Sequence, residues 1–202
     1  MDLKTVQTPE WPQRTTPTPP TLNLPSVASL TTAATGDRTY VLDLLFEPSQ
    51  PLHNLALPLL SGTQFASYDD LIAAVGVQLT ELAESPSTSD TAWLEQILGA
   101  HPRLGEKKVE SAQSRAEQAN LNKAGPGAEA EAAELKRLNE EYEKKFPGLR
   151  YVVFVNGRSR PEIFKNMTER IERGDVKAER LEAIKAMCQI ASDRARKLQN
   201  QQ

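Results

Sequence analysis

From residue 67 onwards, apolar side chains recur at intervals of three and four residues, which is the spacing of an amphipathic helix. The first such stretch begins with a capping box of Ser67 and Asp70. The second has Ser89 or Asp90 as its N-cap and ends at Gly99, because glycine favours the backbone conformation that closes a helix. Each stretch therefore predicts a helix with one buried face.

Four more helices are expected further along the chain. Residues 106–121 are polar around most of the predicted helix, and residues 128–146 are rich in strong helix formers. A capping box at Ser159 begins the third, and the fourth covers residues 177–198. The apolar stripe of this last helix includes Arg194, and an inward-facing arginine requires an anion or a carboxylate as its partner.

Three apolar segments lack this helical period. Residues 39–46 fit a strand or a buried helix, and the helical pattern downstream favours the helix. Pro58 is expected to divide residues 54–60 into short pieces. The β-branched and aromatic run at 151–155 is the strongest extended segment. The pattern as a whole predicts an all-α fold, a single helical domain of roughly seven to nine helices with one short extended segment.

The first 38 residues differ from the rest of the chain. They are rich in Pro, Ser and Thr and have almost no apolar periodicity, so they cannot bury enough surface to offset the entropy of ordering. The sequence therefore predicts a poorly ordered N-terminal arm over residues 1–38 and a helical domain over residues 39–202.

Composition excludes several classes of partner and cofactor. A net charge of −3 disfavours nucleic acid and anionic membranes as partners, while a few arginines suffice for a small anionic ligand. One cysteine, Cys188, and two distant histidines, His53 and His101, argue against a metal site. The chain has no run of 18 apolar residues and does not end in the peroxisomal signal Ser-Lys-Leu, so a cytoplasmic location is expected.

Two groups of residues are candidates for chemistry. Pro102 disfavours helical backbone at His101, which constrains the imidazole just after the second helix, and a histidine with an ordinary pKa near 6.5 suits proton donation at neutral pH. Ser114, Glu117 and Gln118 have the spacing of one helix face. Each also has an ordinary explanation, since His101 fits a structural histidine and the Ser-x-x-Glu spacing fits a solvated face or a capping box.

Four motifs, in order along the chain, resemble those of the OHCU decarboxylases, which act on 2-oxo-4-hydroxy-4-carboxy-5-ureidoimidazoline at the end of the route from urate to allantoin. They are HPRLG at 101–105, Ser-x-x-Glu-Gln at 114–118, YVVFVNGRS at 151–159 and IASDR at 190–194. Phe46-Glu47-Pro48-Ser49 is similar to a further family motif. The resemblance covers about residues 39–198.

The resemblance implies an all-helical carboxy-lyase without a cofactor that converts a small anionic ureidoimidazoline into (S)-allantoin. Homodimers are common in the family, so a homodimer is the candidate assembly. His101 and Glu117 are the implied catalytic residues. The implied substrate-binding residues are Pro102, Ser114, Arg115, Ala116, Gln118, Tyr151, Val152, Val153, Phe154, Val155 and Arg194. The sequence departs from the family pattern at Arg103, where relatives often have an acidic residue.

The alternative function is that of a non-catalytic helical interaction module or a pseudoenzyme of the same fold. In that case His101 and Glu117 are ordinary polar residues, and the helices bind a partner protein. An inward arginine together with a proline-constrained histidine favours the enzyme, because a scaffold requires neither of them.

Overall fold

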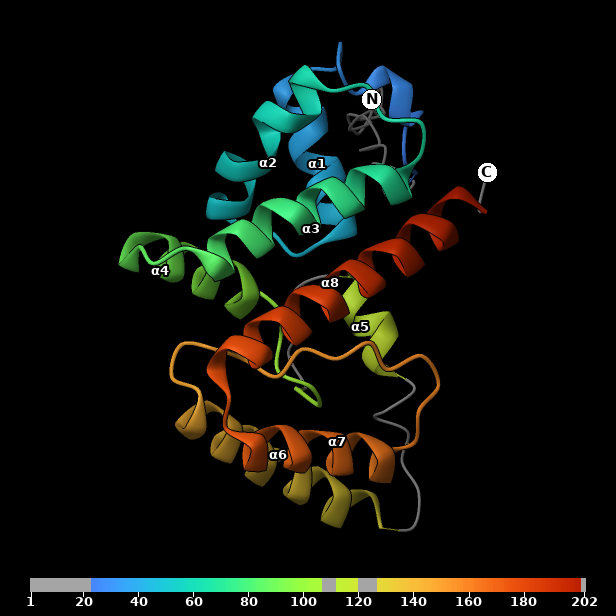
Figure 1. Cartoon of the computed structure of the whole chain (residues 1–202). Helices are drawn as coiled ribbons and strands as arrows, with labels where there is room; N and C mark the ends of the chain where they lie inside the picture. The colour runs from blue at the N-terminus through green and yellow to red at the C-terminus, as the bar shows by residue number, and fades with distance from the viewer. Residues whose placement is uncertain (1–22, 107–111, 120–126, 201–202) are drawn as a thin grey trace, which may run out of the picture.

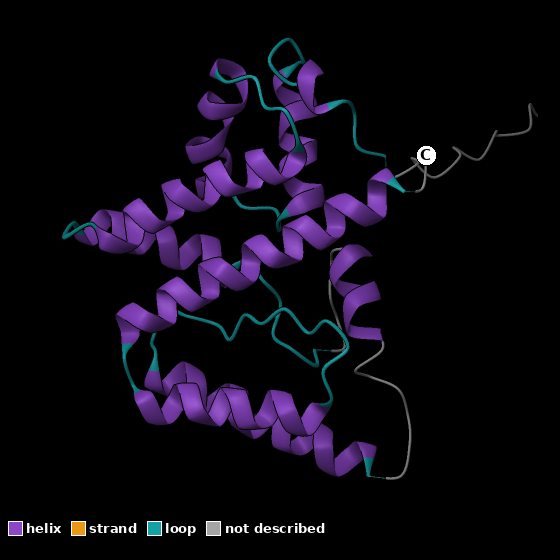
Figure 2. Cartoon of the chain, turned by 45° about the vertical axis from the view of Figure 1, so that its right-hand side comes forward, coloured by secondary structure: helices purple, strands orange, loops and turns teal. Residues whose placement is uncertain are grey.

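The computed structural model describes residues 23–106, 112–119 and 127–200, and within these ranges the chain forms eight α-helices, one short 3-10 helix and no strand (Figures 1 and 2). The predicted all-α fold class is confirmed. The helices are η1 (Val27–Ser29), α1 (Thr35–Leu45), α2 (Gln50–Gly62), α3 (Tyr68–Glu84), α4 (Thr88–Gly99), α5 (Ala112–Ala119), α6 (Ala128–Lys145), α7 (Arg160–Arg173) and α8 (Val176–Gln199).

Helix α8 forms the centre of the arrangement. It packs along α3 and also contacts α1 and α4, while α2 packs against α1, α3 and α4, and α6 and α7 form a pair on the other side of α8 (Figure 1). Gly76 permits the close approach of α3 and α8, because a Cβ at this position would lie 3.0 Å from Cys188 Sγ. The segment between α6 and α7 runs through the space between α8 and the α6–α7 pair (Figures 1 and 2).

One predicted helix start is wrong. The N-cap of α4 is Ser87, not Ser89 or Asp90, because the Ser87 hydroxyl accepts a hydrogen bond from the backbone N–H of Asp90 (3.4 Å). The helix predicted from residue 106 does not include Glu106, whose N–H closes a turn onto the Arg103 carbonyl (3.2 Å). Residues 107–111 and 120–121 of that predicted helix lie outside the described residues.

The two apolar segments near the start of the domain are both helical. Residues 39–45 belong to α1, as the sequence predicts. Helix α2 continues through Pro58, so the predicted division of this segment is wrong. Proline costs the helix one backbone hydrogen bond. The buried side chains of Leu52 and Leu60, one on each side of Pro58, keep the helix on the core.

The described part of the predicted N-terminal arm packs against the helices. Leu24 and Leu30 are 2% and 1% exposed, and the hydroxyl of Tyr68 donates a hydrogen bond to the Pro25 carbonyl (2.9 Å). Residues 35–38, the last of the predicted arm, form the first turn of α1. The domain boundary at residue 38 stays a prediction, and residues 1–22 lie outside the described residues.

A buried carboxylate joins α6, α7 and α8. Glu179, at the start of α8, is 0% exposed and accepts hydrogen bonds from Tyr142 of α6 and from Arg170 and Arg173 of α7. Arg170 is 4% exposed, and its Nη1 also donates to the carbonyl of Val152 (3.1 Å). The same ion pair therefore fixes the segment that follows α6.

We expect Glu179→Gln to lower the free energy of unfolding by about 3 to 5 kcal/mol, because the variant leaves a buried guanidinium without its carboxylate. Urea denaturation followed by circular dichroism measures this loss. Glu172→Gln, at an exposed position on α7, is the matched control and should stay within about 0.5 kcal/mol of the parent. Equal losses in both variants would contradict a special role for Glu179.

Candidate active site

A cavity of about 740 Å³ lies between α8, α5, the loop after α4 and the segment after α6. His101, Glu117 and Arg194, which are far apart in the sequence, all line it. The other lining residues are Pro102, Leu104, Gln113, Ser114, Gln118, Tyr151, Val152, Val153, Phe154, Val155, Asn156, Gly157, Arg158, Ile190, Asp193, Lys197 and Leu198.

The end of α4 positions His101. The N–H of His101 donates to the Leu98 carbonyl (3.3 Å), and its own carbonyl accepts from Arg150 Nη1 (3.0 Å). The side chain is 5% exposed, and Nε2 is buried without a hydrogen-bond partner in the described structure. A buried polar atom without a partner costs free energy. Its position on a cavity wall therefore indicates a place for a ligand.

Burial changes the expected protonation of this histidine. The pKa of His101 is lowered to about 4: loss of solvation lowers it most, the positive charge of Arg194 adds to this effect, and the charge of Glu47 opposes both. The expectation of an ordinary pKa is therefore wrong for the free protein, because the sequence does not show burial. At neutral pH the imidazole is uncharged.

Amide side chains hold the loop that follows His101. Gln118 Oε1 accepts a hydrogen bond from the Gly105 N–H (2.8 Å), and Gln118 Nε2 donates to the Arg103 carbonyl (3.2 Å). Asn139 of α6 donates to the Leu104 carbonyl (3.0 Å). Gly105 has a φ of +83°, in the region that favours glycine, and completes this tight loop. The loop is thus tied to α5 and α6.

Arg194 of α8 binds two carboxylates, as its inward position requires. Nε and Nη2 donate to the two carboxylate oxygens of Glu117 (2.7 and 2.9 Å), and Nη2 also donates to Glu47 Oε1 (2.8 Å). Burial lowers the pKa of Arg194, but the hydrogen bonds and charges of Glu117 and Glu47 raise it above its ordinary value. The carboxylate of Glu117 is therefore held in a fixed orientation at the cavity wall.

The remaining donors of Arg194 also have protein acceptors. Nη1 donates to the carbonyls of Phe46 (2.8 Å) and Leu45 (3.5 Å), and Nη2 lies 3.0 Å from Ser114 Oγ. Ser114 in turn donates to Glu47 (2.5 Å). Since an arginine has five N–H groups, this set of acceptors uses its donor capacity. Arg194 thus orients Glu117 in this structure, and direct contact between Arg194 and a ligand stays a prediction.

Glu47 is a site residue that the spacing argument missed. It is 5% exposed, at the end of α1, and joins Arg194 and Ser114 behind the cavity wall. The signal in the sequence was a carboxylate within the apolar run VLDLLFEPS, where burial of a charge requires a partner.

Residues 151–155 form one wall of the cavity without forming a strand. Two arginine side chains satisfy carbonyls of this segment: Arg170 donates to Val152, and Arg158 donates to Phe154 and Val155. Tyr151 is fixed by its hydroxyl, which donates to Asn166 (2.6 Å), and burial raises its pKa to about 12. Side chains thus supply the partners of three carbonyls in this segment.

Most implied substrate-binding residues line this cavity, with two exceptions. Pro102, Ser114, Gln118 and residues 151–155 belong to the lining. Arg115 is exposed and is not part of the lining, because it points away from the face of α5 that carries Glu117. The side chain of Ala116 lies outside the described residues.

A cavity that combines buried ionisable groups with an apolar wall is the usual site of small-molecule chemistry in an enzyme. The sequence profile of the OHCU decarboxylases matches residues 31–196. Because this match covers most of the chain, the chain belongs to the OHCU decarboxylase family, a family of carboxy-lyases of urate degradation. Among the curated proteins no significant match is found.

The described residues were also compared with the requirements of a metal site and of a membrane-spanning helix. They contain no group of three or more His, Cys, Asp or Glu side chains that could hold a metal ion. No helix among them is long and apolar enough to cross a membrane.

We expect His101 to remain uncharged in the free protein down to about pH 5, because burial and Arg194 lower its pKa to about 4. A pH titration of the imidazole signals by NMR measures this directly. The chain has two histidines, so His53→Gln assigns the signals. A midpoint for His101 near 6.5 would show that the imidazole is solvated and would contradict the described site.

The same shift makes stability depend on pH. The unfolded chain binds this proton near pH 6.5 and the folded chain only near pH 4, so the contribution to stability is complete above pH 6.5 and decreases as the pH falls towards 4. The loss from this one group is about 3 kcal/mol. Urea denaturation at several pH values should show a smaller acid loss in His101→Asn than in the parent.

Proposed function

We propose that the protein decarboxylates 2-oxo-4-hydroxy-4-carboxy-5-ureidoimidazoline (OHCU) to (S)-allantoin. The observation that carries this proposal is the presence of His101 and Glu117 on one cavity, with the Nε2 atom of His101 buried and without a hydrogen-bond partner among the described residues. Membership of the decarboxylase family supports the reaction type. A cavity of about 740 Å³ has room for a small imidazoline ring with its ureido chain.

The substrate carries much of the required chemistry. One ring carbon holds both the carboxylate and a hydroxyl, and the neighbouring ring carbon is part of an imine. When the bond to the carboxylate breaks, the imine accepts the electron pair and carbon dioxide leaves. The former imine nitrogen takes up a proton, and the product of this step is an enol, which needs only a further transfer of a proton from oxygen to carbon to become allantoin. Decarboxylation consumes one proton overall, which solvent can supply.

Glu117 accepts the proton of the hydroxyl in this proposal. Its carboxylate lines the cavity, and two hydrogen bonds from Arg194 fix its orientation. Loss of the hydroxyl proton turns the enol into a carbonyl and directs electron density to the neighbouring ring carbon. A positioned general base of this kind contributes about 10² to 10⁴ in rate.

His101 donates the proton that this ring carbon receives. In the free protein the imidazole is uncharged because of burial. An anionic substrate beside Nε2 adds a negative charge to the same buried site, and this charge favours the imidazolium form. Substrate and proton therefore bind together, and the proton is available at the place where it is needed. Delivery from a fixed imidazole reaches one face of the ring, which gives a single stereoisomer.

The cavity wall orients the ring. The backbone of residues 151–155, together with Pro102, Ser114 and Gln118, surrounds the space between the two catalytic groups. Positioning of this kind can supply a larger part of the rate than proton transfer alone. A cofactor is not required by the chemistry, because the substrate has its own electron acceptor. The homodimer and the cytoplasmic location stay predictions.

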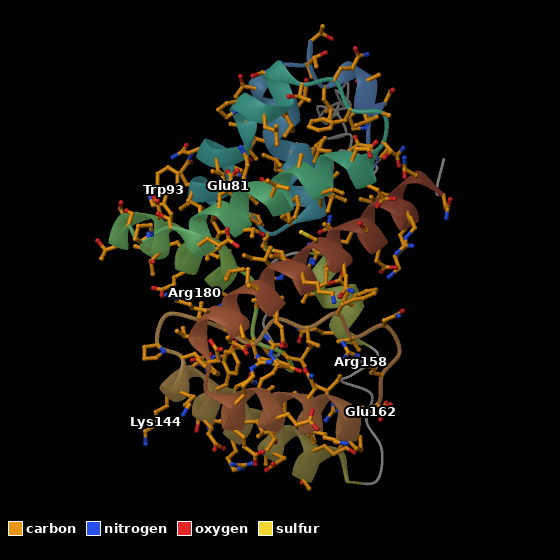
Figure 3. The ribbon with its side chains drawn as sticks, in the orientation of Figure 1. Glu81, Trp93, Lys144, Arg158, Glu162 and Arg180 are labelled. Carbon is orange, nitrogen blue, oxygen red and sulfur yellow. The ribbon has the colours of Figure 1, made fainter. Side chains whose placement is uncertain are left out.

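We expect His101→Asn and Glu117→Gln each to lower kcat by about 10² to 10⁴, because each variant loses one positioned proton-transfer group. The assay follows allantoin from freshly generated OHCU by circular dichroism, which also reports the stereoisomer. Glu81→Gln, which removes one charge from an exposed position of α3 well away from α5, is the matched control and should keep the parent rate (Figure 3).

A parent protein that does not accelerate the decay of OHCU would contradict the proposal. The proposal would also be contradicted if His101→Asn and Glu117→Gln kept the kcat of the parent while their circular dichroism spectra showed that they are folded. In either case, the non-catalytic interaction module with the same fold becomes the better account of the chain.

A further inference from the structure

Five residues with charged side chains line the described cavity, and four of them form two pairs. Glu117 pairs with Arg194, and Asp193 pairs with Lys197 one turn further along α8 (2.5 Å). The fifth is Arg158, which has no carboxylate within ion-pair distance among the described residues. The positive charge of Arg158 is therefore the one that these lining residues leave uncompensated.

The backbone around Arg158 is fixed on both sides. Before it, Asn156 and Gly157 have φ values of 42° and 75°, and the Arg158 N–H donates to the Val155 carbonyl (2.9 Å), which closes a tight turn. After it, Ser159 is the N-cap of α7 in a capping box with Glu162. The turn and the cap hold the main chain of Arg158 at the end of the cavity wall, between α8 and the α6–α7 pair (Figure 3).

The guanidinium of Arg158 is only partly used by the protein. Nε donates to the Val155 carbonyl (3.3 Å), and Nη2 donates to the Phe154 carbonyl. Both N–H groups of Nη1 and one of Nη2 have no acceptor among the described residues. The two carbonyls reduce the freedom of the side chain without neutralising its charge. Such a group can bind an anion at a low entropic cost.

The hydrogen bonds of Ser159 and, to a smaller extent, the charge of Arg158 lower the pKa of the Glu162 carboxyl, but Glu162 makes no ion pair with Arg158. Its carboxylate accepts hydrogen bonds from the N–H and the hydroxyl of Ser159 (both 2.7 Å), so it caps α7 instead (Figure 3). Arg194 is the other arginine on the cavity, and it already binds two carboxylates of the protein. Arg158 thus differs from Arg194 in having both charge and donors to offer.

We propose that Arg158 recognises the carboxylate of the substrate, an inference that rests on the proposed function above. The carboxylate leaves as neutral carbon dioxide, so its contact with Arg158 is strongest before the reaction and is lost during it. An interaction of this kind strengthens binding of the substrate without stabilising the transition state. Arg158 therefore determines the affinity and selectivity for the substrate and does not accelerate the chemical step.

The first test is a comparison of steady-state constants. Arg158→Gln should raise KM by about ten- to a hundredfold, which is the range for loss of a hydrogen-bonded charge, and should leave kcat unchanged or higher. Arg158→Lys should recover part of the affinity because it keeps the charge. Arg196→Gln removes an exposed arginine of α8 outside the cavity and should match the parent.

The second test measures binding without turnover. Calorimetry compares hydantoin-5-acetate with its neutral amide, hydantoin-5-acetamide, which has nearly the same shape but lacks the negative charge and has an NH2 group in place of one carboxylate oxygen. The parent and Arg196→Gln should bind the acetate at least about tenfold more tightly, and Arg158→Gln should bind the two probes equally. Urea denaturation of each variant confirms that the fold is kept.

Two results would overturn the role of Arg158. One is a fall in kcat with an unchanged KM in Arg158→Gln, and the other is a preference for the acetate that survives this substitution. A failure of the proposed function gives a different result, because the parent protein itself would then not accelerate the decay of OHCU. The calorimetric comparison still reports on Arg158 in that case.

Discussion

The guanidinium of Arg194 is the interaction on which the site depends. It is 2% exposed and joins three segments that are distant in the sequence: the end of α1 through Glu47 and Phe46, α5 through Glu117, and its own helix α8. Without this cation, Glu117 and Glu47 would be two carboxylates facing one buried place, where like charges repel. Arg194 thus makes it possible to keep a carboxylate ready at the cavity wall.

A second buried arginine holds the opposite wall. Arg170 pairs with Glu179 and supports the carbonyl of Val152, while its guanidinium lies 4.7 Å from the centre of the Tyr151 ring. Buried ion pairs contribute little net stability, because the loss of solvation offsets their attraction. In this protein the two ion pairs fix the positions of the cavity walls. Both walls are fixed before a ligand arrives, and such preorganisation is what positioning of a small substrate requires.

The local parts of this architecture could be predicted from the sequence, and the parts that depend on burial could not. Helical spacing placed Ser114, Glu117 and Gln118 on one face and Arg194 inside, because the helix period is a local property. The partners of Arg194 lie on other helices, so spacing could not identify Glu47. Burial likewise sets the low pKa of His101, and packing carries α2 through Pro58. Arg158 and Arg170 donate hydrogen bonds to carbonyls of residues 151–155, and helical spacing does not reveal such contacts.

The most direct test of the account is a crystal structure with the product allantoin bound. The account predicts that allantoin lies in the cavity, with His101 Nε2 and the Glu117 carboxylate both within hydrogen-bond distance of its ring atoms and with the Glu117–Arg194 ion pair intact. Allantoin bound elsewhere on the chain, or in the cavity without contact to either group, would contradict the claim that the two residues act on one substrate.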